Sequence, residues 1–297
     1  MGDELDKDAL LLFNKRSRLL MMTAFLVMAA LMMAVVWMAY AGMTHRPALP
    51  EDAARLLGMG KQDKIAVIYL EGQMVSDKSA DAAAGSAFSS EVVKAMRAAT
   101  DDPDVKAIVL RVNSPGGTPV AAEEIISQMK KTRAVKPIVV SMGDIATSAA
   151  YYISSQADRI VANPDTFTGS IGVIWVFKNK SKYYDEGGVS FYVAKTGNYK
   201  DLGSDWRGLT PSEKEYVNAI IEESYNRFVE NVAKGRNLSV EDVKKIADGR
   251  VFTGATAKKI GLVDELGGLY DAVALAKSLG NIKGRAVIAY MNEPAAK

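Results

Sequence analysis

Residues 107–118 read AIVLRVNSPGGT, and this stretch indicates the fold class. An apolar, β-branched run typical of a buried strand ends there in a Pro-Gly-Gly turn, and a helical pattern follows. Similar short runs at Ile65–Leu70 and Pro137–Ser141 are separated by helical stretches at Ser90–Thr100 and Ala121–Lys131. Strands that alternate with helices at this spacing predict βαβ units, a mostly parallel sheet and an α/β fold.

The Asn113–Thr118 turn is a first candidate for chemistry. Proline fixes one φ angle, and the two glycines permit backbone conformations closed to other residues, so backbone amides can be aimed outward where the strand becomes a helix. Such a place suits an oxyanion. A Pro-Gly-Gly sequence is more often only a turn, so this motif does not identify a site by itself.

A second candidate follows the run Pro137–Met142. The Gly-containing loop at residues 143–147 ends this strand, and the Ala-rich stretch after it predicts a helix that begins at Ser148. A hydroxyl there lies at the positive end of the helix, and the Ala149 amide is free to point at a reacting carbonyl. The alternative is that Ser148 only caps the helix, which is the commonest role of serine at that position.

Composition excludes several classes of site. The 297 residues include 37 Lys and Arg, 35 Asp and Glu, one His and no Cys. The net charge of +2 gives nucleic-acid binding no support. Cysteine proteases, disulfide scaffolds and thiolate metal sites need a residue that the chain lacks. Because His45 is the single histidine, a Ser/His/Asp triad is improbable, and we expect no metal and no cofactor.

A serine nucleophile without histidine needs another base. A lysine can serve where burial lowers its pKa from about 10.4 toward about 7 or 8. Lys200 lies in TGNYKDLG, residues 196–203, shortly after the apolar run Phe191–Ala194. Lys195 is the competing candidate, and spacing alone does not choose between them. A solvated surface position is the common alternative for either lysine.

The N-terminal region contains a candidate membrane anchor. Leu19–Met43 holds no Asp, Glu, Lys, Arg or His, and as a helix it would span roughly 37 Å, enough for a hydrocarbon core of about 30 Å. Three basic residues lie within residues 15–18, whereas only Arg46 follows closely, so the N-terminus is predicted to be cytoplasmic. A buried core helix and a signal peptide cleaved after Ala39-Tyr40-Ala41 are the alternatives, and the length favours an uncleaved anchor.

The predicted organisation has four parts along the chain. They are a cytoplasmic N-terminus at residues 1–18, a membrane anchor at 19–43, a linker at 44–63 and one α/β domain at 64–297. Late in that domain, Thr210–Glu213 forms a capping box with proline at the first helical position. The apolar residues between Tyr216 and Val229 then recur at helical spacing, which indicates core or a subunit contact.

Several separated motifs, taken in order, resemble those of the bacterial signal peptide peptidase A family. They are NSPGG at 113–117, TSAAYY at 147–152, TGSIG at 168–172, GNYK at 197–200, and GRVFTG at 249–254 with GLVD at 261–264. The resemblance covers the chain from about Ile65 to the C-terminus, together with the anchor. It implies a ClpP/crotonase-like fold and a membrane-bound Ser/Lys protease that cuts signal peptides after their release from secreted precursors.

Carried over residue by residue, the resemblance assigns Ser148 as the nucleophile and Lys200 as the general base. It implies that the Gly117 and Ala149 amides form the oxyanion hole and that the Ser170 hydroxyl orients the lysine amine. The choice of Gly117 over its neighbour Gly116 follows an analogy with the related Clp protease. The choice of Lys200 over Lys195 likewise comes from the resemblance and not from physics.

The resemblance also implies partners and a location. We expect apolar, extended peptides such as cleaved signal peptides as substrates, a lipid bilayer around the anchor, and no nucleic acid. Because the chain holds one such domain, like the short form of the family, we expect a homo-oligomeric ring in which Ser148 of one protomer faces Lys200 of the next. The expected location is the inner cell membrane, crossed once, with the catalytic domain on the outer, periplasmic side.

Two other function classes stay open on the sequence. One is a quality-control protease of the same fold that acts on membrane-protein fragments. The other is a non-catalytic, membrane-anchored scaffold. A serine-directed probe separates enzyme from scaffold, and peptide profiling separates the two protease functions.

Overall fold

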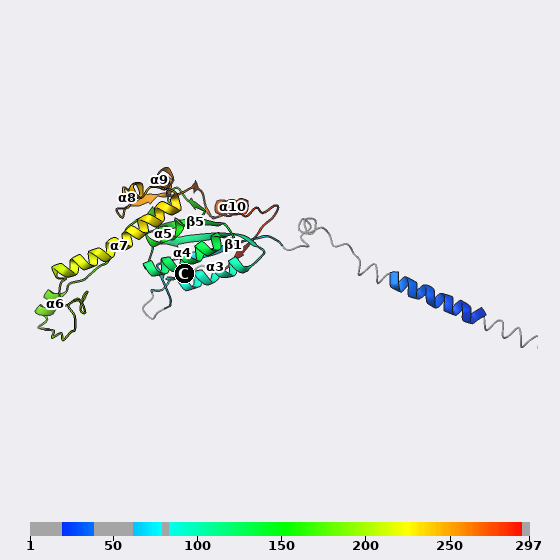
Figure 1. Cartoon of the computed structure of the whole chain (residues 1–297), viewed down its shortest axis with the longest axis horizontal. Coiled ribbons are helices and arrows are strands. Elements are labelled where there is room, and N and C mark those ends of the chain that lie inside the picture. Colours follow the sequence, from blue (N-terminus) through cyan, green and yellow to red (C-terminus); the bar gives the residue numbers. More distant parts are fainter. Residues whose placement is uncertain (1–19, 39–61, 79–82, 293–297) are drawn as a thin grey trace, which may run out of the picture. The chain divides into compact units, whose positions relative to one another are not determined.

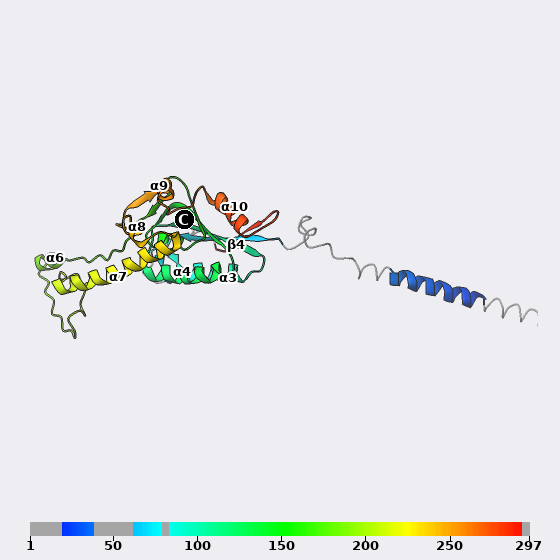
Figure 2. The same ribbon diagram turned by 45° about the horizontal axis from the view of Figure 1, so that its top comes forward.

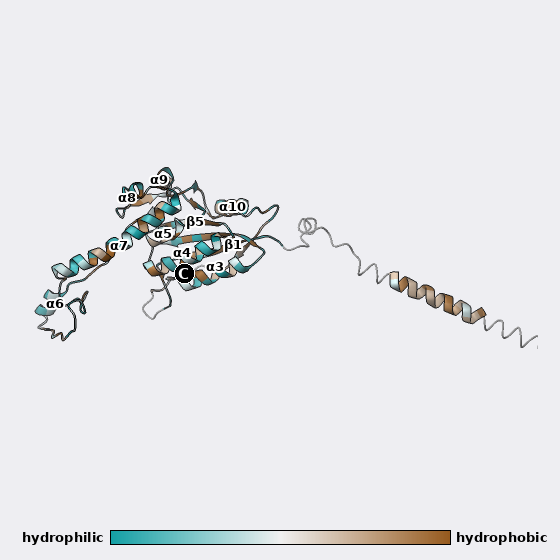
Figure 3. Cartoon of the chain, in the orientation of Figure 1, coloured by the Kyte–Doolittle hydropathy of each residue, from teal (hydrophilic) through white to brown (hydrophobic). Residues whose placement is uncertain are grey.

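The computed structural model describes residues 20–38, 62–78 and 83–292, and the chain divides into the units Met1–Gly60 and Lys61–Lys297. In the first unit, Leu20–Met38 form a helix with a mean hydropathy of 2.3. Much of its ribbon is brown in Figure 3, the colour of hydrophobic residues. Its length of about 28 Å is close to the thickness of a bilayer's hydrocarbon core. The rest of the predicted anchor, the N-terminus and residues 44–61 of the linker lie outside the described residues.

The second unit is built on a mostly parallel sheet with the strand order β10-β1-β4-β5-β6-β9, as the alternation of strands and helices predicts. Within the described residues the pairs along this path are all parallel, and β7 joins β5 in parallel and β8 in antiparallel fashion. The strands are β1 (Lys64–Glu71), β4 (Val105–Ser114), β5 (Ile138–Thr147), β6 (Arg159–Ala162), β7 (Phe167–Gly169), β8 (Val251–Thr253), β9 (Glu265–Leu266), β10 (Val287–Tyr290), and a separate parallel pair, β2 (Met74–Val75) and β3 (Ala87–Phe88).

Helices cover both faces of the sheet, which is why its central strands are almost continuously apolar. Successive residues of a strand point to opposite faces, so Ile68 and Leu110 belong to a core shared with α3 and α4, whereas Val67 and Val109 belong to a core shared with α10. Figure 2 shows these two layers. The helices are α3 (Ser89–Asp101), α4 (Pro119–Arg133), α5 (Ala149–Ser154), α6 (Ser181–Glu186), α7 (Pro211–Arg236), α8 (Val240–Lys244), α9 (Gly254–Lys259) and α10 (Leu269–Leu279).

The strand β5 is longer than the sequence predicts. The loop expected to end it after Met142 is part of the strand, which continues to Thr147. Its register against β4 shifts between Val112 and Ser114, and the side chain of Asn113 fills the irregularity, because its Oδ1 accepts a hydrogen bond of 3.2 Å from the Ile145 N–H. The extension then pairs with β7, and β5 therefore ends beside that strand rather than after a loop.

An arm projects from this body and consists of residues 174–210, with α6, and the first half of α7 (Figures 1 and 2). The capping box at Thr210–Glu213 is present as predicted. The apolar stripe of α7 joins the main core only toward its C-terminal end, through Phe228 and Val229. Near the outer end Val217 is also buried, whereas Tyr216 is 48% exposed. None of residues 174–210 is buried, and the aromatic rings of Tyr184, Phe191 and Trp206, which pack on one another there, stay partly exposed.

Candidate active site

Ser148 occupies a strained backbone position between β5 and α5. Its φ of 55° and ψ of −127° are rare for a residue with a side chain. The turn is held because the Ser148 N–H donates a hydrogen bond of 2.8 Å to the carbonyl of Gly169. The helix begins one residue later than predicted, at Ala149, and the Ser148 side chain makes no capping hydrogen bond. The simple capping role that the sequence left open is therefore not what the side chain does.

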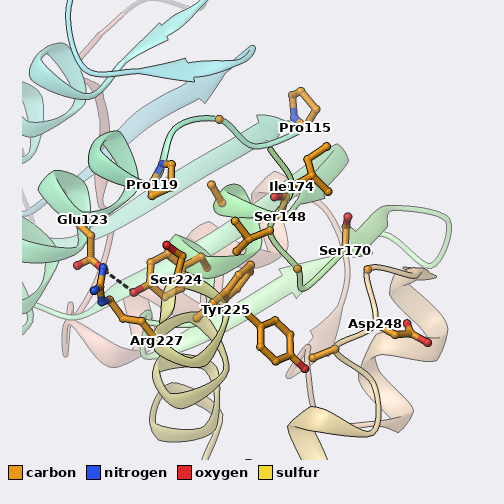
Figure 4. Close-up of a pocket in the computed structure, with 18 residues that line it drawn as sticks. Pro115, Pro119, Glu123, Ser148, Ser170, Ile174, Ser224, Tyr225, Arg227 and Asp248 are labelled. Atoms are coloured by element: carbon orange, nitrogen blue, oxygen red, sulfur yellow. Dashed lines mark hydrogen bonds between the residues drawn. The ribbon is translucent and has the colours of Figure 1, made fainter. Parts of the chain in front are cut away.

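The serine instead lines a cavity of about 600 Å³, together with Gly117, Ala149 and Ser170. Figure 4 shows Ser148 in the middle of the lining residues, with Ser170 on one side of it and with Glu123 and Arg227 at the opposite end. The predicted nucleophile, both predicted oxyanion donors and the predicted orienting serine therefore meet at one place. Lys200 is not among the residues that line this cavity.

The Pro-Gly-Gly turn forms one wall of the cavity. Met74 of β2 pairs with Gly117 in a parallel bridge, donating from its N–H to the Gly116 carbonyl at 2.8 Å and accepting from the Thr118 N–H at 3.0 Å. A residue bridged in this way points its own N–H to the opposite side. The Gly116 N–H, in contrast, donates to Ser114 Oγ at 3.1 Å. The amide of Gly117 is thus the better placed of the two to donate into the cavity.

Close packing at this turn requires both glycines. A Cβ on Gly117 would lie 2.1 Å from the Met74 carbonyl oxygen. Gly116 has a φ of 114°, and a Cβ there would lie 2.9 Å from the Cβ of Ser148 and 3.1 Å from the Ala149 nitrogen. The turn therefore lies directly over the serine.

Ser170 follows β7 as Ser148 follows β5. Thr147 pairs with Gly169 in the parallel register, so the two serines come next on neighbouring strands, which run about 4.8 Å apart. Ser170 also has a positive φ, of 50°, and its N–H donates to the Arg250 carbonyl at 2.8 Å. The two hydroxyl residues are placed by the backbone pairing of one sheet.

The helix α5 is fixed by two buried tyrosines. The Tyr151 hydroxyl donates to the Leu262 carbonyl at 3.0 Å, and the Tyr152 hydroxyl donates to Glu123 Oε1 at 2.5 Å. Burial raises the pKa of each hydroxyl above its ordinary value, so both tyrosines stay neutral at ordinary pH. They hold the helix rather than exchange protons. Because Ala149 is the first residue of α5, its N–H has no acceptor within the helix.

Sequence reasoning missed three of the supporting side chains. Tyr152 stands four residues after Ser148, a spacing that places it one helical turn away. Glu123, which lines the cavity, and Asn113, which supports β5, lie on other elements and carry no local signal. The hydrogen bond of Asn113 to β5 is what permits the strand to reach Ser148.

The two carboxylates that line the cavity are already engaged. Glu123 accepts the Tyr152 hydroxyl. The carboxylate of Asp248 accepts from Arg250 Nε at 2.8 Å, and this hydrogen bonding lowers the pKa of Asp248 to about 2. The Ser148 hydroxyl has no hydrogen-bond partner among the described residues. A base for Ser148 is therefore missing from the described part of a single subunit.

The structure separates the two candidate lysines. Lys195 Nζ contacts Asp201 Oδ1 at 2.5 Å and the Asn198 carbonyl at 3.1 Å, so its ammonium group is engaged in the arm. Lys200 is exposed on the same arm, and within the described ranges its amine has neither an ion pair nor a hydrogen bond. Its segment, between α6 and α7, lies far from the sheet in both Figure 1 and Figure 2.

Comparison with known proteins places the chain in a family. Residues 130–283 match the model of peptidase family S49. A Synechocystis protein provisionally named a protease is 43% identical over 64% of this chain and 69% of its own length. Protease 4 of Salmonella typhi is 40% identical over 77% of this chain, and serine protease SPPA of Arabidopsis thaliana, named as chloroplastic, is 34% identical over 75%.

The matched region is only part of the two longer relatives, 37% of Protease 4 and 33% of the Arabidopsis protein. The match nevertheless confirms the resemblance to signal peptide peptidase A at the level of the family. The chain belongs to peptidase family S49 and is a serine protease with the ClpP/crotonase-like fold of that family.

Proposed function

We propose that the chain is a membrane-anchored serine endopeptidase in which Ser148 is the nucleophile and Lys200 of a neighbouring subunit is the general base. The observation that carries this proposal is a mismatch within one subunit. Among the residues that the structure describes, the cavity holds a strained serine beside two backbone amides but no base, and the arm displays a lysine without a partner. Each half supplies what the other lacks.

The arrangement suits acyl transfer. A neutral Lys200 amine takes the proton of Ser148 Oγ as the oxygen attacks the peptide carbonyl, and the Gly117 and Ala149 amides donate to the resulting oxyanion. The protonated lysine then gives its proton to the leaving amine, and water hydrolyses the acyl-enzyme. The Ser170 hydroxyl, next to Ser148 in the sheet register, hydrogen-bonds the amine and orients it.

The surface of the arm supports assembly. Ile174, Trp175 and Tyr192 are 87%, 51% and 95% exposed in the single subunit. Large apolar side chains that gather on a surface mark an interaction site, and contact with a second copy would bury these three. In a head-to-tail ring, each arm would reach the cavity of the next subunit. This arrangement would bury the exposed apolar side chains and would bring Lys200 to Ser148.

The substrates we propose are released signal peptides, which are apolar and accumulate at the membrane where the helix Leu20–Met38 would hold the enzyme. The names of the relatives agree with this, since they include a serine protease SPPA. The basic residues before the helix favour a cytoplasmic N-terminus and a catalytic domain on the outer face of the inner membrane. Membrane-protein fragments are the alternative substrates, and profiling with both kinds of peptide decides between them.

Mixed rings test the dyad. Ser148→Ala and Lys200→Ala are each expected to be inactive. Rings formed from equal amounts of both should regain about a quarter of wild-type activity, because that share of sites pairs an intact serine with an intact lysine from the neighbour. Mixing Ser148→Ala with a second Ser148 variant, Ser148→Gly, is the control and should stay inactive. A mixture that assembles into rings but remains as inactive as its parents would contradict an intersubunit dyad.

A further inference from the structure

Both neighbours of Lys200 are held by side-chain contacts, whereas the lysine amine itself makes no hydrogen bond or ion pair within the described residues. The ring of Tyr199 packs on Tyr216, with 5.1 Å between ring centroids. On the other side, the Asp201 carboxylate accepts two hydrogen bonds from Arg207, 2.9 Å from Nε to Oδ2 and 2.7 Å from Nη2 to Oδ1. These contacts fix the backbone at residue 200 and do not use its side chain.

Arg207 also holds a second carboxylate. Its Nη1 donates to Glu213 Oε2 at 2.8 Å and its Nη2 donates to Glu213 Oε1 at 2.6 Å. Glu213 belongs to the first turn of α7, where it completes the capping box with Thr210. One guanidinium group therefore joins the turn that carries Lys200 to the start of the helix. We call the three side chains of Asp201, Arg207 and Glu213 the arginine clamp.

The two carboxylates of the arginine clamp are largely shielded from solvent. The side chains of Asp201 and Glu213 are only 9% and 3% exposed. Hydrogen bonds from Arg207 lower the pKa of Glu213 to about 2 and hold the pKa of Asp201 below its ordinary value. Both carboxylates stay ionised across the neutral range, and the clamp stays closed there.

We propose that Arg207 is a positioning residue for the general base: through Asp201 and Glu213 it sets where the arm presents Lys200 to the neighbouring subunit. This inference rests on the proposed Ser148 and Lys200 dyad. An arginine is required because its planar group donates to two carboxylates in fixed directions, which the single ammonium of a lysine does not do.

Replacement of Arg207 tests the role directly. Arg207→Gln should lower kcat about 100-fold, the cost expected when a catalytic group is displaced by about 1 Å, with KM changed little because the cavity of Ser148 is intact. Arg207→Lys should recover only part of the loss. Arg133→Gln is the matched control, since Arg133 at the end of α4 donates to Asp158 in a similar pair, and neither residue lines the cavity. Its kcat should stay within about twofold.

Mixed rings distinguish positioning from general damage. If Arg207 acts through Lys200, Arg207→Gln subunits still offer an intact Ser148, so mixing them with Ser148→Ala subunits should restore activity to about a quarter of wild type. Mixing them with Lys200→Ala subunits should restore nothing, because no subunit then presents the lysine correctly. A kcat for Arg207→Gln within about threefold of wild type, or a loss that Ser148→Ala does not complement, overturns the proposal.

A second variant tests the role of Arg207 if the first does not fold, and Lys200→Ala tests the dyad separately. If Arg207→Gln does not assemble, Asp201→Asn replaces it, because this variant keeps the shape of the clamp and removes one of its charges. Mixing with Ser148→Ala subunits should restore its activity, and mixing with Lys200→Ala subunits should not. Normal kcat in Asp201→Asn then refutes positioning. If Lys200→Ala remains active, the dyad itself is wrong; if Lys200→Ala is inactive and Arg207→Gln is fully active, only the positioning role is wrong.

Discussion

Gly116→Ala is the most demanding test of the active-site geometry. Gly116 lies in the turn over Ser148 with a φ of 114°, and an added Cβ would stand 2.9 Å from the serine Cβ, 3.1 Å from the Ala149 nitrogen and 3.1 Å from the Thr147 carbonyl. The methyl group therefore has backbone on two sides and the nucleophile on the third. It can be accepted only if the turn, and with it the Gly117 amide, moves away from the serine.

The size of the effect has two parts. A side chain at a positive φ costs about 1 to 2 kcal/mol, and a methyl group forced into packed surroundings costs about 1 to 3 kcal/mol. Together these penalties of about 2 to 5 kcal/mol act against the arrangement that binds the oxyanion. If the turn relaxes instead of the whole fold, kcat/KM should fall by about 30-fold to about 5,000-fold.

The assay compares kcat/KM on an apolar fluorogenic peptide with labelling by a serine-directed probe and with thermal unfolding. Gly284→Ala is the matched control, because Gly284 has a similar φ of 97° but nothing within 4 Å of the added Cβ. It should lose about 1 to 2 kcal/mol of stability and keep its activity. If Gly116→Ala retains kcat/KM within about threefold of wild type, the turn does not lie over the nucleophile as described, and the reasoning fails.

Three further predictions follow from the supporting contacts. Asn113→Ala removes the acceptor for the Ile145 N–H and should lower the free energy of unfolding by about 1 to 3 kcal/mol. Labelling by the serine-directed probe should fall in parallel. Asn113→Asp keeps an acceptor and should show neither loss. Tyr152→Phe leaves Glu123 and Asn231 without the hydroxyl between them. It should lower the melting temperature, measured by calorimetry, while kcat/KM changes little. A large loss of kcat/KM in a stable variant would show that the hydroxyl takes part in the reaction. The folded-state pKa of Glu213 is lowered to about 2, below its ordinary value. Its contribution to stability is therefore complete above about pH 5 and is lost as the pH falls toward about 2. Acid unfolding of Glu213→Gln should depend less on pH in that range, and an unchanged acid transition would refute the contribution.

The sequence predicts those parts of the fold that depend on local patterns. The strands around residues 65–70 and 107–112, the helices around residues 90–100 and 121–131, and the capping box at 210–213 all appear where apolar periodicity and cap chemistry place them. Each of these signals involves residues a few positions apart. The mostly parallel sheet follows from their alternation, because parallel strands need crossover connections.

The parts that the sequence does not predict depend on contacts between distant segments. Nothing in GDIAT indicates that β5 continues to Thr147, because the continuation requires the side chain of Asn113 from β4 and the backbone of β7. The tie between Lys195 and Lys200 could not be resolved either. The structure distinguishes the two lysines only by their contacts: Asp201 engages Lys195 and, through Arg207, holds the backbone beside Lys200. The role of Lys200 as the base is part of the proposal.

The two halves of the proposed site are built by different means, and the difference has a consequence for activity. Ser148 is held by the sheet and by the fully buried helix α5, so its geometry exists in a single subunit. The backbone at Lys200 is held by charged side chains in the segment between α6 and α7, which lies far from α5 in Figure 1. On the proposed mechanism, an isolated subunit carries a nucleophile that nothing deprotonates. Proteolysis would then begin only once subunits assemble, and a mutation that disrupts assembly should abolish kcat while leaving the fold around Ser148 intact.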